Sequence, residues 1–232
     1  MSSLLYVILV PALLPVFAVL FYVYINDREE REPLGLILFV FLMGALFALP
    51  CSFVETSLMS IFFPESETAS LSYVFQKNLF AVALVEEFSK WLVFRLFVWN
   101  NRNFDYRYDG IVYAVTASLG FAGLENIFYI MSFGREIALQ RAIFAIPAHT
   151  TFGIFMGYFL AKAKSGLIHG YADSSKLKAL VVPVIIHALY DFLLSQQVAE
   201  AGFQYTFFIL VILLDFTAWK ILRNGFKTDR EL

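Results

Sequence analysis

Apolar runs of about 20 residues recur along the whole chain, and each is long enough to cross a bilayer as a helix. Of the 232 residues, 60% are hydrophobic and 16% are charged. Soluble domains are about 45–50% apolar and about 25% charged, so this composition excludes an ordinary soluble fold. An outer-membrane barrel would show short alternating segments, which this sequence lacks. The chain is therefore predicted to be all-α, a polytopic transmembrane helical bundle.

Seven runs are predicted as spans: Ser3–Ile25, Leu34–Phe63, Tyr73–Trp99, Gly110–Met131, Arg141–Ala161, Ala179–Val198 and Phe203–Leu222. The second run is long enough to span with a tilt or with a break near Pro50. The first run has no preceding Lys or Arg and no small-residue cleavage site after it, so we expect a retained span rather than a signal peptide. No repeat or domain boundary is evident, and residues 1–232 are expected to form a single integral-membrane domain.

The distribution of positive charge predicts the orientation of the bundle. Twelve Lys and Arg residues fall on one side, namely Arg28, Arg31, Arg102, Arg107, Lys162, Lys164, Lys176, Lys178, Lys220, Arg223, Lys227 and Arg230. Only Arg135 and Arg141, with Lys77 at a helix entrance, oppose this bias. Cytoplasmic loops carry the excess of Lys and Arg, so the N-terminus is predicted outside and the C-terminus in the cytoplasm.

Ionisable side chains inside the spans are few, and each costs a few kcal/mol at the bilayer centre. They are Glu86, Glu87, Lys90, Glu125 (beside Asn126), His149, His187, Asp191 and Asp215. Measured from the outer end of each span, most of them lie roughly 9–17 Å deep at 1.5 Å per residue. Four helices therefore place acid, amide and imidazole groups at one level in the outer half of the membrane.

The spacing of these residues predicts which of them share a helix face. Glu86 and Lys90 are four residues apart and can pair, whereas Glu87 points about 100° away. His187 and Asp191 have the same spacing, so both can reach one cavity. Glycines that would let helices approach closely surround this level, at Gly120, Gly123, Gly153 and Gly157, and Phe121 forms an aromatic wall one turn from Glu125.

Two chemistries suit such a layer. A carboxylate withdrawn from water beside a second carboxylate is a stronger base and could activate water, while an imidazole stabilises an oxyanion. Alternatively, Glu and His could hold a divalent metal ion that activates the water. The sequence has no His-Glu-x-x-His and no Gly-x-Ser-x-Gly, and its single cysteine, Cys51, is expected to be a small core residue.

Four motifs in four successive spans resemble the PrsW family of intramembrane proteases. They are Glu86-Glu87-x-x-Lys90, Phe121-x-x-x-Glu125-Asn126, His149 after Pro147, and His187-x-x-x-Asp191. The chain is more distantly similar to the CAAX-prenyl endopeptidase and bacteriocin-processing superfamily. It departs from that superfamily because Lys90 stands one place before the expected Arg, Glu125 replaces a His, and Asp191 replaces an Asn. These departures favour the PrsW branch and argue against a prenylated substrate.

The resemblance implies an intramembrane endopeptidase of a bacterial plasma membrane, with a catalytic core at about residues 73–198. It implies the site-1 cut, on the extracytoplasmic side, in a single-span anti-sigma factor, which initiates regulated intramembrane proteolysis and an envelope-stress response. By this resemblance Glu86 is the general base, Glu87 and Lys90 support it, and His187 with Asp191 binds the carbonyl or oxyanion. Glu125, Asn126 and His149 are the other expected site members. No cofactor is expected; a metal such as zinc is the less favoured alternative.

Other interpretations of these residues are structural or concern transport. Glu86, Glu87 and Lys90 could form a salt bridge that locks the bundle, and Glu125 with Asn126 could make interhelical hydrogen bonds. Asp215 is expected to be structural or to face a cavity. In the loops and at the span ends, His169 is expected to be solvated and Glu55 to be interfacial. A proton-coupled transporter also uses buried Glu, His and Asp, but would show an internal repeat. With a net charge of −2 and no basic stripe, nucleic acid is not an expected partner.

Overall fold

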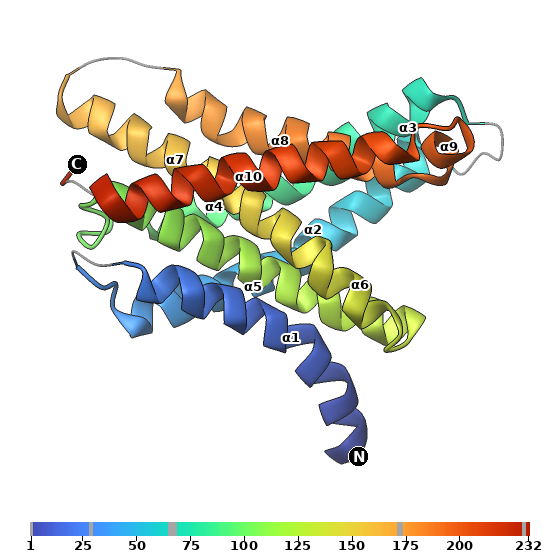
Figure 1. The fold of residues 1–232 in the computed structure, drawn as a ribbon, viewed down its shortest axis with the longest axis horizontal. Helices are drawn as coiled ribbons and strands as arrows, with labels where there is room; N and C mark the ends of the chain where they lie inside the picture. Colours follow the sequence, from blue (N-terminus) through green and yellow to red (C-terminus); the bar gives the residue numbers. More distant parts are fainter. Residues whose placement is uncertain (1, 28–29, 65–68, 171–173, 229–230) are drawn as a thin grey trace.

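The computed structural model describes residues 2–27, 30–64, 69–170, 174–228 and 231–232, which form a helical bundle (Figure 1). Its helices are α1 (Ser2–Ile25), α2 (Leu34–Phe62), α3 (Leu71–Lys77), η1 (Asn78–Ala83), α4 (Leu84–Phe97), α5 (Arg107–Phe133), α6 (Ile137–Ile143), α7 (Ala145–Ile168), α8 (Ser175–Leu194), α9 (Gln196–Glu200) and α10 (Gln204–Thr228). The described residues contain no strand beyond one isolated bridge between Tyr106 and Glu231. The predicted all-α class is confirmed.

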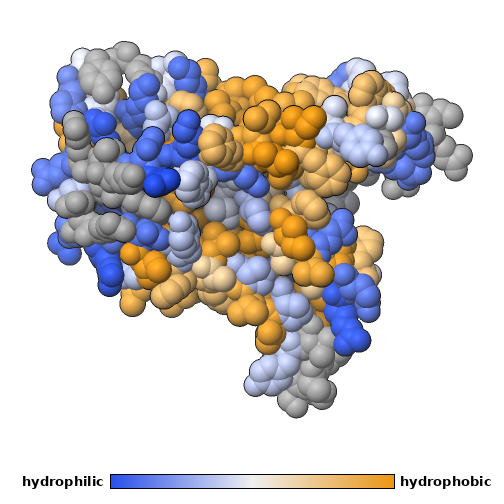
Figure 2. Space-filling view, in the orientation of Figure 1, coloured by the Kyte–Doolittle hydropathy of each residue, from blue (hydrophilic) through white to orange (hydrophobic). Residues whose placement is uncertain are grey.

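Within the part of the chain that the structure describes, six stretches of helix are long and apolar enough to cross a membrane, and the sixth predicted run is among them as α8. The predicted Tyr73–Trp99 span corresponds to α3, η1 and α4, which follow one another without a break. An apolar band crosses the middle of the bundle, and hydrophilic residues gather toward its two ends (Figure 2). About seven membrane-spanning segments are therefore consistent with the fold, and the chain is a multi-pass membrane protein.

Proline does not interrupt the N-terminal helices. The expected possibility of a break near Pro50 is wrong, because α2 continues through this residue to Phe62. Pro11 and Pro15 likewise lie inside α1. Membrane helices tolerate proline where neighbouring helices and local adjustments satisfy the freed backbone groups. The length of α2 is consequently accommodated in one continuous helix.

The α5 helix is the centre of the bundle and packs against α1, α2 and α7 (Figure 1). Two of these contacts bring backbones together at glycine. A Cβ atom on Gly120 would lie 2.0 Å from the carbonyl oxygen of Phe41 in α2. A Cβ atom on Gly157 would lie 2.2 Å from the carbonyl oxygen of Gly110 in α5. The predicted role of glycine in close helix approach is confirmed at these crossings.

The C-terminal ends of α1, α4, α7 and α10 lie at the same end of the bundle (Figure 1). This end carries the loops that the charge count predicts to be cytoplasmic. At this end the backbone N–H of Leu232 donates a hydrogen bond to the carbonyl of Asp105 at 2.7 Å. Arg28 and Arg230, which the charge count also used, lie outside the described residues. The direction of the bundle in the membrane stays a prediction.

Candidate active site

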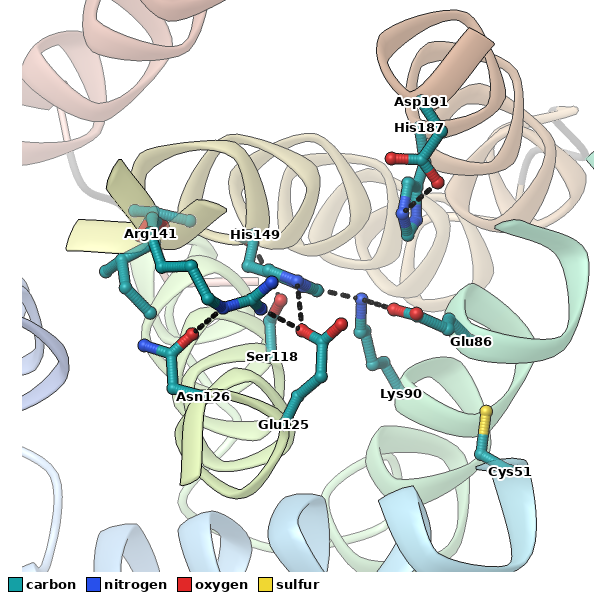
Figure 3. A network of polar contacts seen from close by, with 12 residues as sticks. Cys51, Glu86, Lys90, Ser118, Glu125, Asn126, Arg141, His149, His187 and Asp191 are labelled. Carbon is teal, nitrogen blue, oxygen red and sulfur yellow. Dashed lines mark hydrogen bonds and ion pairs between the residues drawn. The ribbon is translucent and has the colours of Figure 1, made fainter. Parts of the chain in front are cut away.

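Polar residues from several helices meet around the ammonium group of Lys90 (Figure 3). Its Nζ lies 2.6 Å from Oε1 of Glu87 and 3.2 Å from Oε2 of Glu86. Nδ1 of His149, from α7, lies 2.9 Å from the same ammonium. The Lys90 side chain has no exposed surface, so these groups replace water around its charge. The expectation that Glu87 points away from this pairing is wrong, because the long lysine reaches residues three and four positions before it.

The helix that carries this acidic pair is irregular just before it. Residues Asn78–Ala83 form a π-helix, in which each turn holds an extra residue. This segment changes the face on which Glu86 projects relative to the regular α3 helix. Asn78 is itself buried and lines the same cavity as Glu86. A π-helical turn leaves no clear signal in an apolar sequence, so periodicity did not predict it.

A second group of polar contacts is centred on Glu125 of α5. Its Oε2 accepts from Nη2 of Arg141 at 2.7 Å and lies 3.1 Å from Nε2 of His149. Nε of Arg141 donates to Oδ1 of Asn126 at 2.5 Å, and Nδ2 of Asn126 donates to the carbonyl of Ala12 at 3.2 Å. Figure 3 shows Arg141 and Lys90 on opposite sides of the Glu125–His149 pair. These bonds hold α1, α5, α6 and α7 in one arrangement.

His187 of α8 bridges two carboxylates. Its Nδ1 lies 3.0 Å from Oε1 of Glu87, and its Nε2 lies 3.2 Å from Oδ2 of Asp191. The Phe152 ring stacks on the imidazole with centroids 4.6 Å apart. The i,i+4 spacing of His187 and Asp191 thus brings both side chains to one place, as the helix period requires.

The hydrogen-bond partners determine where protons lie on the two imidazoles. An ammonium can only donate, so Lys90 makes Nδ1 of His149 an acceptor, and the proton of this ring is on Nε2, facing Glu125. An ionised carboxylate can only accept, and His187 has one at each nitrogen. His187 is therefore the imidazolium and His149 the neutral imidazole.

A cavity of about 360 Å³ opens beside these groups. It is lined by five of the predicted site residues, Glu86, Glu125, His149, His187 and Asp191, together with Asn78, Arg141 and several aromatic residues. The Asp191 and Glu125 side chains keep 27% and 20% of their surface exposed, so water can reach the cavity. Glu87 and Lys90 do not line it. The two adjacent glutamates therefore differ, because Glu86 lines the cavity whereas Glu87 is fully buried and does not line it.

Sequence reasoning missed Arg141. It was counted only as a positive charge that opposes the predicted orientation. The structure places it in the short helix α6, where it lines the cavity and contacts Glu125 and Asn126. The sequence did contain a signal for its role. Arg141 falls on a side of the predicted bundle that has almost no other positive charge, and such an isolated charge suggests a function.

The remaining singled-out residues lie away from this cavity. Asp215 accepts a hydrogen bond from Oγ1 of Thr151 at 2.7 Å. Cys51 is a buried free cysteine, as expected. Its thiol donates to Oε1 of Glu55, at 3.4 Å, and Glu55 is half-buried on α2. His169 is exposed at the end of α7, also as expected.

Glu86, Glu87 and His187 are the residues here that could hold a metal ion, since one ligand atom of each lies within 4.8 Å of the others. The donor set does not fit one well. The Lys90 ammonium is 2.6 Å from one of these carboxylates and 3.2 Å from the other, so it already supplies the positive charge. His187 would have to release a proton that faces a carboxylate before either of its nitrogens could bind a metal ion. Oε2 of Glu87 is buried with no hydrogen-bond partner in the described structure, but one oxygen does not make a site.

Comparison with known proteins identifies relatives over most of the chain. A family model described as "PrsW family intramembrane metalloprotease" matches residues 32–216. A protein named Protease PrsW from Oceanobacillus iheyensis is 40% identical over 188 residues, which cover 81% of this chain and 83% of that protein. Proteins of the same name from Geobacillus kaustophilus and Bacillus subtilis are 36% and 35% identical, over 90% and 78% of this chain and 87% and 79% of their own. No solved structure matches.

The matched region runs from the start of α2 into α10 and contains every helix that lines the cavity. Both the family model and the relatives therefore cover the site as well as the surrounding bundle. The chain belongs to the PrsW family of intramembrane proteases.

Proposed function

We propose that this protein is an intramembrane endopeptidase in which Glu86 activates water for attack on a peptide bond. The observation that carries the proposal is the difference between the two adjacent glutamates in their access to the cavity. Glu86 lines the cavity, with its side chain 6% exposed, while Glu87 is fully buried between Lys90 and His187. A general base must reach both water and substrate, and only Glu86 of this pair does so.

The reaction follows from this placement. Water attacks the carbonyl carbon of the scissile bond while Glu86 takes one of its protons, which gives a tetrahedral intermediate with a negative oxygen. The intermediate collapses, the carbon–nitrogen bond breaks, and Glu86 returns the proton to the leaving nitrogen. The products are a carboxylic acid and an amine, and Glu86 is again a carboxylate.

His187 is proposed to stabilise the negative oxygen. It is a cation at the wall of the cavity, within hydrogen-bond distance of Asp191, whose side chain is 27% exposed. An N–H donor that is held in place before the reaction stabilises a developing oxyanion strongly in a site that excludes bulk water. Phe152 and Glu87 fix the imidazole on its other sides, so the N–H at Nε2, which faces Asp191, is the donor that would be shared with the oxyanion.

Lys90, Glu125, His149 and Arg141 are proposed to position the catalytic groups. Lys90 holds Glu86 by an ion pair, and His149 and Glu125 continue this chain of contacts to Arg141. Because the Lys90 ammonium occupies the position where a cation would neutralise the acidic pair, no step here depends on a metal ion. Glutamate-activated water is the chemistry that this donor set supports.

The proposed substrate is a single-span anti-sigma factor, cut on the extracytoplasmic side as the first step of regulated proteolysis and a stress response. Two observations support it: the family resemblance, and the location of the cavity toward the end of the bundle away from the basic loops. With the predicted orientation, the N-terminus outside and the C-terminus in the cytoplasm, that end faces outward.

Co-expression with a candidate single-span anti-sigma factor tests this function. Wild type should produce an extracytoplasmic fragment, and Glu86→Gln and His187→Gln should reduce its formation by about 100-fold or more, the usual contribution of such groups. Asp215→Asn is the matched control, because it changes a half-buried intramembrane carboxyl group outside the cavity. Undiminished cutting by folded Glu86→Gln would exclude the proposed base. If wild type cuts no such substrate, proton-coupled transport becomes the better-supported function.

A further inference from the structure

A second cavity, of about 530 Å³, lies between α5, α7 and α10 near the end of the bundle that holds the C-terminus (Figure 1). It shares no lining residue with the candidate active site. Along α5, Ile111 of this cavity and Glu125 of the site are separated by roughly 20 Å at 1.5 Å per residue. The cavity is therefore a separate feature of the molecule.

The lining of this cavity is polar at one end and apolar at the other. Arg107, the first residue of α5, and Lys162 supply two positive charges, and Nη2 of Arg107 donates to Oγ of Ser165 at 3.4 Å. Toward the middle of the bundle the lining consists of Phe155 and Phe159 on α7 with other apolar groups. None of the described lining residues is acidic. The wall of the cavity therefore presents positive charge near the end of the bundle and apolar surface toward the middle of the bundle.

The helices that line the cavity pack closely at one point and extend far enough to hold a lipid. A Cβ atom on Gly225 of α10 would lie 2.8 Å from Cδ2 of Tyr108, so α10 approaches α5 closely within the lining itself. Along α7 the lining extends from Ser165 to Phe155, which is roughly 15 Å of helix. This length accommodates a headgroup and the first part of an acyl chain.

We propose that this cavity binds an anionic phospholipid of the adjacent leaflet. The lipid phosphate would lie between Arg107 and Lys162, and an acyl chain would lie against Phe155 and Phe159. Basic pockets between transmembrane helices on the cytoplasmic side bind anionic headgroups, and the cytoplasmic leaflet carries a negative surface potential because it contains anionic lipids. This end of the bundle is predicted to lie on that side. A soluble anion would satisfy the charges alone and leave the apolar part of the wall in water. A zwitterionic lipid would place its own cation among the two positive charges.

Lipid binding to the purified full-length protein in detergent tests the proposal. Phosphatidylglycerol, phosphatidylcholine and soluble glycerol phosphate are titrated separately, and bound lipid is counted by native mass spectrometry alongside the thermal unfolding midpoint. Phosphatidylglycerol should bind and raise the midpoint, and the other two should not. Arg107→Gln with Lys162→Gln should weaken phosphatidylglycerol binding about thirty-fold, the effect of two surface-level positive charges.

The matched control is Lys220→Gln with Arg223→Gln, which removes two charges from the same end of the bundle. These side chains lie over the rings of Phe216 and Trp219 and do not line the cavity. Binding by this control should equal that of wild type. If the cavity variant does not fold, Asn224→Asp, which adds a negative charge to the lining, should weaken binding instead. Equal losses in the two double variants, equal binding of phosphatidylcholine, or equal binding of glycerol phosphate would each overturn the proposal.

Discussion

Nδ1 of His187 lies 3.0 Å from Oε1 of Glu87, although the two residues are 100 positions apart in the chain. The contact joins α8 to α4 beside the cavity, and the same oxygen of Glu87 also accepts a hydrogen bond from Lys90 at 2.6 Å. Glu87 therefore contacts two buried cationic groups at once, and it shares their charge with Glu86 at Lys90 and with Asp191 at His187. This explains why two adjacent acids stand in one span: one completes the buried ionic core, and the other remains available to the cavity.

Removal of the central cation should destabilise the bundle. Lys90→Met leaves two buried carboxylates without their counter-ion, and breaking a buried pair by deleting one partner costs about 3–5 kcal/mol. The unfolding midpoint in detergent should fall sharply. Lys178→Met, at an exposed position on α8, should leave it unchanged. A Lys90→Met protein as stable as wild type would show that the acidic pair does not depend on this ammonium.

Arg141 should matter for the rate of cleavage more than for stability. Arg141→Gln removes a charged hydrogen bond from Glu125, and the rate should fall about 10- to 100-fold. We expect kcat to fall with little change in KM, and the unfolding midpoint to fall less than in Lys90→Met, because the Arg141 side chain is 11% exposed and that of Lys90 is fully buried. Arg141→Lys, which keeps the charge, should recover part of the rate. The control is Arg135→Gln, whose side chain is 71% exposed on the same side of the bundle. Similar rates for the Arg141 and Arg135 variants would contradict this role.

Chelation should not abolish cleavage. Lys90 occupies the position of a cation among Glu86, Glu87 and His187, so the purified enzyme should keep its rate with a strong zinc chelator. Metal analysis of the same sample should find less than one equivalent of transition metal. Loss of activity that returns on addition of zinc would show instead that the side chains rearrange around a metal.

The loop between α1 and α2 should make stability depend on pH. Burial, reinforced by the nearby charge of Asp27, raises the pKa of Glu32 from 4.5 to about 7, although a hydrogen bond from Tyr113 opposes the shift. The folded state then holds a proton that the unfolded state has lost, so stability should decrease as pH rises from about 5 to about 8. Glu32→Gln should raise the unfolding midpoint at pH 8 and reduce this slope. Glu30→Gln, at an exposed neighbouring position, should do neither.

Helix crossings should be sensitive to a single methyl group. Gly120→Ala places a Cβ atom 2.0 Å from a backbone oxygen of α2, so the helices must separate, and overpacking of this kind costs about 1–3 kcal/mol. The control is Gly35→Ala on α2, where a Cβ atom meets nothing within 4 Å. The Gly120 variant should unfold at a lower temperature than the Gly35 variant. Equal midpoints would show that the crossing can relax without cost.

The class of fold and most members of the polar layer were predictable from the sequence. Long apolar runs can satisfy their backbone hydrogen bonds in a bilayer only as helices, so the all-α bundle followed from composition and length. The i,i+4 spacing of His187 with Asp191, and of Glu86 with Lys90, followed from the helix period. Close approach at Gly120 and Gly157 was also predictable, because glycine there has no other physical purpose.

The partners of these residues could not be predicted, because they depend on how the helices pack. Helix periodicity is local, and it contains no information on how one helix is rotated against another. The choice of Glu86 over Glu87 as the acid that faces the cavity depends on the π-helical turn at Asn78–Ala83 and on His187, which arrives from a distant helix. Arg141 joined the site because the chain turns back between α5 and α6. Such contacts depend on packing between helices, which a linear pattern of polar and apolar residues does not specify.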